Sequence, residues 1–456
     1  MSENFFLNKF SFIILLIPLL LITGPFLPDL VLSLSCLFFI VLTIVNKNYY
    51  IYDNLFTKIF ISFWILLIIS SLISDNILAS LKSSFFYFRF GLFILLLNYL
   101  IKKNQNFEER LISVCFYSII LVILSCLIEF FILRFSYFTQ IYEIYTSTDS
   151  VNFNVQLGQL TNTVNNRVSG LFGSEGVAGS YILRLMPFFF LYCLILENKN
   201  VLTKKKIFIY NLIFVIIIFA VLISGERAAF LLLIFTIFLN FLIIKKLRNL
   251  FKFSILASII IIISVVNFDP IIKGRVIDQT KYQLNNLTDG SKKKASDQKV
   301  KQTFIISEIH EGHFNAAWKI FSENKIFGAG MKGFRYKCYS SEKFKSDESV
   351  YCSTHPHNTF MQFLSETGIT GTIFYLIILV LLSFEILKNF YLVNIKNRTS
   401  DYKLDFKNCA LVSIFVNIWP LTTSGNFFNN WLSILYFLPV VFYLKNKKIF
   451  NNEKVS

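Results

Sequence analysis

The residues best suited to acid–base chemistry in this chain are its four histidines, and all of them lie in one polar segment. His310 and His313 come first, and His355 and His357 follow directly before a long apolar block. A loop histidine titrates near neutral pH and is a natural general base under physiological conditions. The sequence therefore makes His357 the candidate catalytic base, with His310, His313 and His355 as supporting or substitute contacts.

Two other interpretations of these histidines stay open. Asn358 and Thr359 follow His357 and can cap the helix that begins there, so local hydrogen bonds could give the histidine a purely structural role. Four histidines together also raise a zinc site, since imidazole is a common zinc ligand. Their spacings match no established zinc pattern, so we predict no metal and no cofactor.

Arginines form the second candidate set: Arg89, Arg134, Arg167, Arg184 and Arg227. Arginine at lipid depth is costly and usually marks a functional pathway. A guanidinium fork matches phosphate oxygens better than any other side chain. We expect an anionic headgroup, such as a lipid diphosphate, with contacts from Arg227, Arg167, Arg184 and Arg89.

Two simpler roles could explain some of these arginines. Long cationic side chains also snorkel to ordinary phospholipid phosphates. Glu129 and Glu226 could instead pair with one or two of the guanidinium groups. Either outcome would remove individual arginines from the expected headgroup site.

The elements that must position these side chains are membrane helices. Hydrophobic residues make up 55% of the 456 positions, and they come in blocks of roughly 17 to 23, the length that spans a bilayer. The pattern predicts an all-α polytopic membrane protein with about twelve transmembrane helices. The expected spans lie near 9–25, 28–45, 57–73, 84–101, 111–133, 176–196, 206–223, 227–244, 250–268, 364–387, 409–422 and 431–445. The first block has no cleavage site, and we expect it to be retained.

The distribution of basic residues predicts the orientation of the chain in the membrane. The formal net charge is +17, but the basic residues lie between apolar blocks rather than in one domain, which argues against nucleic acid. They concentrate in alternate connections, so we expect both termini in the cytoplasm and two long loops outside, 134–175 and 269–360. The expected domains are 1–268 with spans one to nine, 269–360 as a large outer loop or cap between spans nine and ten, and 361–456 with spans ten to twelve and the tail.

The large outer loop is long enough to fold into a cap. Its segment 315–323 is amphipathic, with Ala317, Trp318 and Phe321 as expected packing residues. Cys338 and Cys352 lie in this loop, and an outward-facing loop is an oxidising setting, so we favour a disulfide between them over two free thiols.

Several short motifs surround the candidate residues. The first is His357-Asn358 followed by Gly368-Ile-Thr-Gly371. The others are Arg167-Val-Ser-Gly-Leu-Phe-Gly, Ser224-Gly-Glu-Arg227-Ala and the stretch from Trp318 to Phe-Gly-Ala-Gly330. Together these motifs resemble the O-antigen ligase and polymerase-like superfamily, and the resemblance covers most of the chain from about residue 165 onward.

The resemblance implies a metal-independent glycosyltransferase of the bacterial inner membrane. It would act at the periplasmic face on a glycan carried by undecaprenyl diphosphate, and transfer it to a hydroxyl of lipid A-core or a similar acceptor. The family's histidine base maps onto His357, and its diphosphate-binding arginine maps onto Arg227.

The chain departs from the family pattern in one place. Relatives commonly carry a further arginine before the Ala-Trp-like helix, where this chain has His310 and His313. Either of these histidines substitutes for it, or Arg275 or Arg335 reaches in from elsewhere in the loop.

Two other functions remain as alternatives. A polymerase that joins lipid-linked repeat units would differ only in its acceptor. A flippase or transporter of lipid-linked sugars would need charged residues at mid-bilayer, whereas the expected span centres are almost uniformly apolar.

Overall fold

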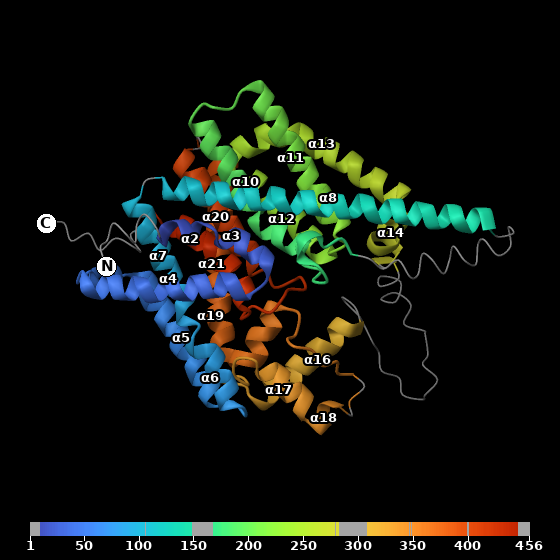
Figure 1. Ribbon diagram of the computed structural model, residues 1–456. Coiled ribbons are helices and arrows are strands. Elements are labelled where there is room, and N and C mark those ends of the chain that lie inside the picture. Colours follow the sequence, from blue (N-terminus) through green and yellow to red (C-terminus); the bar gives the residue numbers. More distant parts are fainter. Residues whose placement is uncertain are drawn as a thin grey trace.

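The computed structural model describes residues 10–104, 106–147, 167–278, 280–281, 308–345, 347, 349–398 and 401–445, and every regular element within them is helical (Figure 1). The first half contains α2 (Ser11–Leu15), α3 (Ile17–Leu20), η2 (Leu21–Thr23), α4 (Phe26–Val45), η3 (Tyr49–Ile51), α5 (Leu55–Leu72), α6 (Ile77–Phe85), α7 (Phe88–Lys103), α8 (Phe107–Ser147), η4 (Gly170–Phe172), α10 (Ala178–Asn198) and α11 (Lys204–Ile223). The second half contains α12 (Arg227–Ile243), α13 (Lys245–Phe268), α14 (Pro270–Lys273), η5 (Gly274–Asp278), α16 (Glu308–Glu323), α17 (Gly333–Ser340), α18 (Glu342–Lys345), α19 (Thr359–Phe390), η6 (Tyr391–Ile395), α20 (Tyr402–Asn417) and α21 (Asn430–Leu444).

Eight helices of the described chain are long and apolar enough to cross a membrane, as expected for a polytopic membrane protein. Two more, α12 and α21, are apolar but shorter, with 17 and 15 residues. Helices of this length reach only about 22–26 Å, against about 30 Å for the hydrocarbon core. The total of about twelve spans therefore stays a prediction.

The N-terminal block expected as one span, 9–25, is divided into α2, α3 and η2. Pro18 stands in the first turn of α3, where its missing N–H costs nothing. Gly24, with a φ of 107°, ends the segment before α4. This block is therefore not the single continuous helix that its composition suggested.

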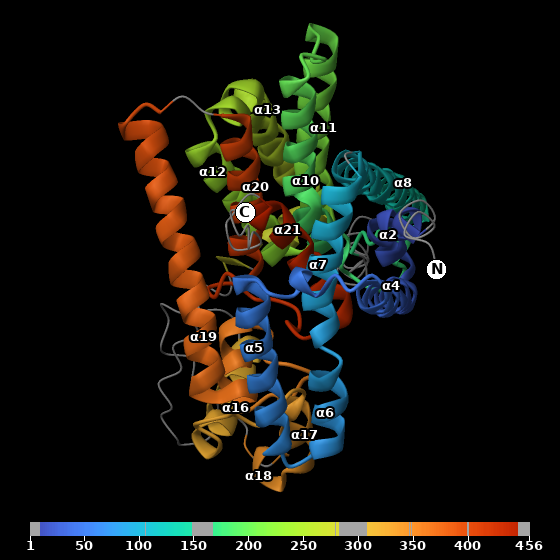
Figure 2. The same ribbon diagram turned by 90° about the vertical axis from the view of Figure 1, so that its left-hand side faces the viewer.

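The first expected outer loop also starts later than its composition indicated. Helix α8 continues through Ser147, so the beginning of the range 134–175 is helical, and the loop's residues 148–166 lie outside the described chain. The helix is seen along its length in Figure 1 and points toward the viewer in Figure 2.

The helix that follows the histidines is folded back on itself. Gly368 interrupts α19 with φ 64° and ψ −162°. The rings of Phe363 and Tyr375 stack with their centroids 4.9 Å apart, although twelve residues along one continuous helix would separate them by about 18 Å. Residues 359–367 and 369–390 are thus the two arms of a hairpin, and the span expected at 364–387 is not a simple crossing.

The turn of this hairpin is held by the segment after α16. Backbone hydrogen bonds run from Ala329 N to Ser365 O and from Gly330 N to Glu366 O, each 2.9 Å. A Cβ on Gly328 would lie 2.4–2.5 Å from backbone atoms of residues 366–368. The Phe-Gly-Ala-Gly stretch and the glycine of the His-Asn motif therefore serve the same contact between two backbones.

Three helices of the range expected to form a cap, α16, α17 and α18, lie together at one end of the molecule beside α5 and α6 (Figures 1 and 2). A disulfide joins Cys338 to Cys352, and the cap core contains Ala316, Ala317, Ile320 and Phe334. The prediction for Trp318 was wrong, because this side chain is 57% exposed. The helical period places it on the face opposite the core.

Candidate active site

The four histidines come together in one cluster. The ring centroid of His357 lies 4.1 Å from that of His355, 5.0 Å from His313 and 5.7 Å from His310. Helix α16 supplies two of these rings, and the loop before α19 supplies the other two. The contact between α16 and the α19 hairpin therefore assembles the cluster.

His357 is fixed by its backbone and by its neighbours. Its φ of 53° lies in the left-handed region, which is uncommon for a side chain of this size and is found most often at constrained sites. Its carbonyl accepts a 2.9 Å hydrogen bond from Ser424 N, and its Nε2 lies 3.0 Å from the Ser353 hydroxyl. A hydroxyl group therefore fits against this ring nitrogen.

Asn358 provides the helix cap that the sequence suggested. Its Oδ1 accepts from Met361 N at 3.0 Å. Its Nδ2 donates to the carbonyls of Pro420 and Thr422 at 2.7 and 3.2 Å. The residue therefore joins the start of α19 to the loop between α20 and α21, and its contacts are structural.

The cluster favours neutral imidazoles. Burial lowers the pKa of His355 to about 3, with nearby His357 adding to the effect. Burial also lowers the pKa of His357 to about 4, together with His313 and His310. Burial lowers the pKa of His310 too, followed by the influence of His313 and of Arg227. A neutral imidazole is the form that can accept a proton.

Three guanidinium groups lie beside this cluster. Burial lowers the pKa of Arg275, and the neighbouring charges of Arg167 and Arg227 lower it further. Arg227 also lies within electrostatic range of His310. Arg167, Arg227 and Arg275, which we call the arginine triad, thus lie near one another, and Arg227 connects them to the imidazoles.

Glycines make room for the triad. A Cβ on Gly176 would lie 3.1–3.2 Å from Arg167, and one on Gly225 would lie 3.1–3.2 Å from Arg275. Two of these arginines line a pocket of about 530 Å³, whose other lining residues are Glu129, Leu133, Ser169, Gly173, Ser174 and Gly176. This volume lies in the range of ordinary ligand sites.

Arg275 is the member of the triad that the sequence offered only as an alternative. Its Nε and Nη1 are buried and make no hydrogen bond within the described part of the chain. The segment that carries it, α14 and η5, is anchored by a bidentate ion pair between Arg134 and Asp269. This contact joins segments far apart in the chain, and no local motif in the sequence marks it.

The carboxylates of Glu129 and Glu226 accept hydrogen bonds from backbone amides. Glu129 accepts hydrogen bonds from Ser169 N and Gly170 N at 2.9 and 2.5 Å. Glu226 accepts from Gly179 N and Ser180 N at 2.6 and 3.2 Å, at the start of α10. The two carboxylates shape the Arg167 loop and the α10 terminus.

Arg184 makes its contacts within α10 and with α21. Its Nη1 donates to Ser180 O at 2.9 Å, and its Nη2 donates to the Tyr436 hydroxyl at 3.2 Å. The guanidinium also lies over the Tyr436 ring, with its Cζ 5.3 Å from the ring centroid. Arg184 is 6% exposed, and it neighbours Glu226, so it supports the α10 terminus.

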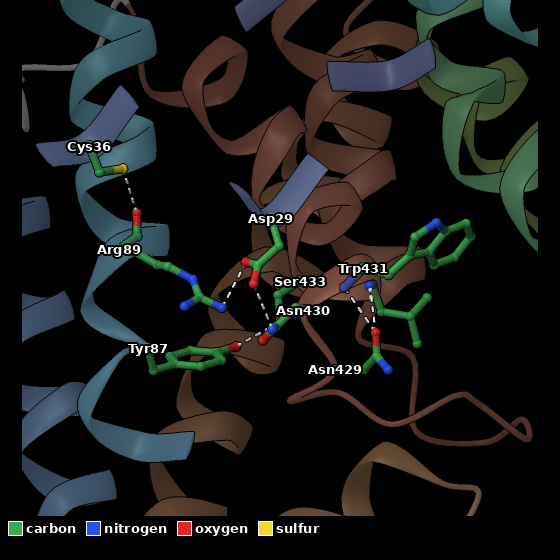
Figure 3. Close-up of polar contacts among 9 residues, drawn as sticks. Asp29, Cys36, Tyr87, Arg89, Asn429, Asn430, Trp431 and Ser433 are labelled. Carbon is green, nitrogen blue, oxygen red and sulfur yellow. Dashed lines mark hydrogen bonds and ion pairs between the residues drawn. The ribbon is translucent and has the colours of Figure 1, made fainter. Parts of the chain in front are cut away.

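Arg89 is engaged elsewhere. Its Nη2 lies 2.8 Å from Asp29 Oδ1, and Asp29 also accepts from Asn430 at 3.1 Å. Figure 3 shows this contact between α4, α7 and α21. The charge of Arg89 is therefore compensated by a carboxylate, which favours a role in helix packing over headgroup binding.

Arg335 also lies near the cluster. It lies within electrostatic range of His355 and of the buried carboxyl of Glu366. Among the described residues, no group of three or more His, Cys, Asp or Glu side chains has an arrangement that could hold a metal ion.

The family model described as O-antigen ligase matches residues 212–376. Over this range the chain is similar to the O-antigen ligase family. The matched range runs from α11 into α19 and includes Arg227, Arg275, Gly368 and all four histidines. No curated protein matches the chain.

This similarity agrees with the resemblance drawn from the short motifs. The family supports a glycosyltransferase of the ligase and polymerase type, acting on lipid-linked glycans. Arg167, Arg184 and Arg89 lie before the matched range. The pocket is therefore built jointly by the matched range and the preceding helices.

Proposed function

We propose that this protein transfers a glycan from undecaprenyl diphosphate to a hydroxyl of lipid A-core or a similar acceptor. The observation that carries the proposal is the meeting of the imidazole cluster with the arginine triad, at Arg227 and His310. A base and a diphosphate site are the two parts that such a transfer requires.

In the proposed reaction, His357 accepts the proton of the acceptor hydroxyl. The hydroxyl oxygen then forms a bond to the anomeric carbon of the donor glycan. The bond between that carbon and the diphosphate oxygen breaks, and the diphosphate leaves with the electron pair. The arginine triad neutralises the charge that develops on the leaving group, which is usually the largest single contribution to such a reaction.

The pKa values of the imidazoles fit this order of events. A bound diphosphate would bring negative charge to a site that is otherwise cationic, and a nearby opposite charge favours the protonated imidazole. The affinity of His357 for the proton would therefore be greatest while the donor is in place.

We propose no metal in the reaction, because three guanidinium groups can supply the charge neutralisation that a divalent cation provides in other transferases. A reconstituted transfer assay with and without chelator tests this point. Activity lost on chelation and restored by a divalent cation would contradict it.

We further propose that the protein lies in the bacterial inner membrane with both termini in the cytoplasm and the histidine cluster toward the periplasm. The distribution of Lys and Arg between the apolar helices supports this orientation.

His357→Asn tests the base, since asparagine tolerates the positive φ at this position. Transfer from undecaprenyl-diphosphate glycan to lipid A-core should fall about 10²–10⁴-fold, the usual contribution of a general base. Ser322→Ala, on the exposed face of α16, serves as the matched control and should retain activity. Near-normal transfer by a well-folded His357→Asn protein would remove the histidine from the mechanism.

The glycan profile of a deletion strain tests the acceptor. A ligase defect leaves long glycan chains on the lipid carrier, whereas a polymerase defect leaves single repeat units. Accumulation of single repeats would replace the proposed acceptor with another lipid-linked glycan and leave the proposed chemistry intact.

A further inference from the structure

An exposed apolar stripe follows the second arm of the α19 hairpin. Ile369, Ile373 and Ile377 recur at helical spacing, and all three are exposed. Val380, Phe384 and Leu387 continue the stripe toward the far end of the helix. This arm is part of a candidate membrane span, so the stripe is the surface that lipid chains would cover. It begins directly after the turn at Gly368.

The neighbouring helices α5 and α6 also expose apolar side chains near the turn at Gly368. Ser70 of α5 donates hydrogen bonds to Phe327 O and Glu366 O at 2.5 and 2.8 Å, which places it beside the hairpin turn. The exposed side chains that follow it on α5 and α6 include Leu72, Ile73, Ile77 and Leu78. The apolar surface of the bundle therefore extends to the level of the turn.

The cap continues this surface. Ile369 N donates to Lys325 O at 2.8 Å, and Thr370 N donates to Ile326 O at 3.2 Å. These bonds set Ile326, which is 61% exposed, against the first turn of the stripe. Trp318 lies two turns earlier on α16 and contacts Phe321, with ring centroids 5.5 Å apart.

We propose that the surface formed by Trp318 and the half-buried Phe321 of α16, together with Ile326 just after that helix, lies in the outer leaflet against lipid acyl chains. Tryptophan is enriched where a membrane protein meets the lipid interface. The opposite side of α16 is already used, because Ala316, Ala317 and Ile320 are fully buried in the cap core. Continuity with the stripe on α19 identifies lipid as the occupant of the free side.

This placement has a consequence for the depth of the candidate site. If the turn at Gly368 lies near the outer lipid surface, the first arm leads from there back into the bundle. Its nine residues from Thr359 to Thr367 correspond to about 14 Å of helix. His357, directly before that arm, then lies below the lipid surface. The inference concerns only the membrane position and holds whether or not the proposed reaction is correct.

Spin labelling in lipid nanodiscs tests the proposal. Trp318→Cys and Ile326→Cys would each carry a nitroxide, with Ile377→Cys as the lipid-exposed reference and Ser340→Cys on α17 as the water-exposed reference. The five free cysteines of the parent chain are buried, and the labelled parent protein gives the background. Collision rates with oxygen, which concentrates in lipid, are compared with those of a water-soluble nickel chelate.

The labels at positions 318 and 326 should collide preferentially with oxygen, as the label at 377 does. Preferential collision with the nickel chelate, as at position 340, would overturn the proposal. Low collision rates with both reagents would also overturn it, because they would show that protein covers this face. If Trp318→Cys does not fold, Ile326→Cys alone decides between these outcomes.

Discussion

At the scale of single residues, the unusual feature is that neutral imidazoles and guanidinium groups share one site. Burial and neighbouring positive charge both disfavour a protonated imidazole. His357 is therefore a base over a wider pH range than a solvated histidine. The same surroundings leave Arg275 with buried nitrogens that make no hydrogen bond among the described residues, which is a costly arrangement unless an anion is bound.

The pKa of about 4 for His357 predicts the acid limb of the pH–rate profile, which is the pH range in which activity is lost on acidification. The base is neutral above that pKa and is lost as the pH falls through it. Because kcat/KM reports groups of the free enzyme, this parameter should decline only as the pH approaches 4, rather than near the 6.5 of a model histidine. His310→Gln removes a neighbour whose protonation lowers the pKa of His357, and it should move the limb to higher pH. A limb near 6.5 in the unaltered protein would show that another group titrates.

Arg275 and Arg89 should respond differently to substitution. Arg275→Gln removes a guanidinium from the pocket, and transfer should fall about 10²–10³-fold, as for loss of one donor to a developing anion. Arg89→Lys keeps a charge beside Asp29 and should change thermal stability more than transfer. Donor titrations with both proteins check the difference, and equal kinetic effects would contradict the separation of Arg89 from the triad.

At the scale of elements, the α19 hairpin and its contact with α16 create the site. The first arm carries His357 and Asn358 at its start, and the turn at Gly368 is bonded to the residues that follow α16. Because His310 and His313 lie on α16, the same contact sets their distance from His357. A substitution at Gly368 should therefore alter the distances within the histidine cluster, although it lies outside that cluster.

Gly368→Ala is the corresponding test. The residue has a φ of 64°, and a Cβ would lie 2.5 Å from Gly328 N and Ile326 O. Strain and overlap together should cost about 3 kcal/mol or more and lower both the yield of folded protein and transfer. Gly274→Ala is the matched control, since no atom lies within 4 Å of its Cβ and its φ is −55°. Thermal unfolding in detergent measures both, and tolerance of Gly368→Ala would exclude this account of the turn.

At the scale of the whole molecule, charge and helix length describe how the protein sits in a membrane. Long apolar helices reach across the bundle, while α12 and α21 are too short to do so unaided. Arg227 and the loop before α21 lie at the ends of these short helices. We therefore expect the protein surface to be lower on that side of the membrane.

Cysteine labelling in intact spheroplasts tests the orientation. Ser340→Cys on the cap should react with a membrane-impermeant maleimide from outside. Asn200→Cys, in the connection between α10 and α11, should react only after permeabilisation. The reverse pattern would invert the proposed topology, and labelling of both from outside would show that the charge distribution does not set it.

The sequence by itself indicated a polytopic membrane protein and marked His357 as its candidate base. Apolar blocks of bilayer length require helices, because backbone groups in lipid must bond within their own segment. The distribution of basic residues indicated an orientation, and the His-Asn motif marked one end of a helix. These are local properties, and a local pattern in the chain is enough to express them.

Only the tertiary structure decided which charged side chains share the site. Arg89 and Arg227 look alike in the sequence, yet one pairs with Asp29 and the other joins Arg167 and Arg275. The fold-back at Gly368 was equally hidden, since one glycine in an apolar run does not reveal its φ. Both depend on contacts between segments far apart in the chain, and the free energy of such contacts is set by packing rather than by local composition.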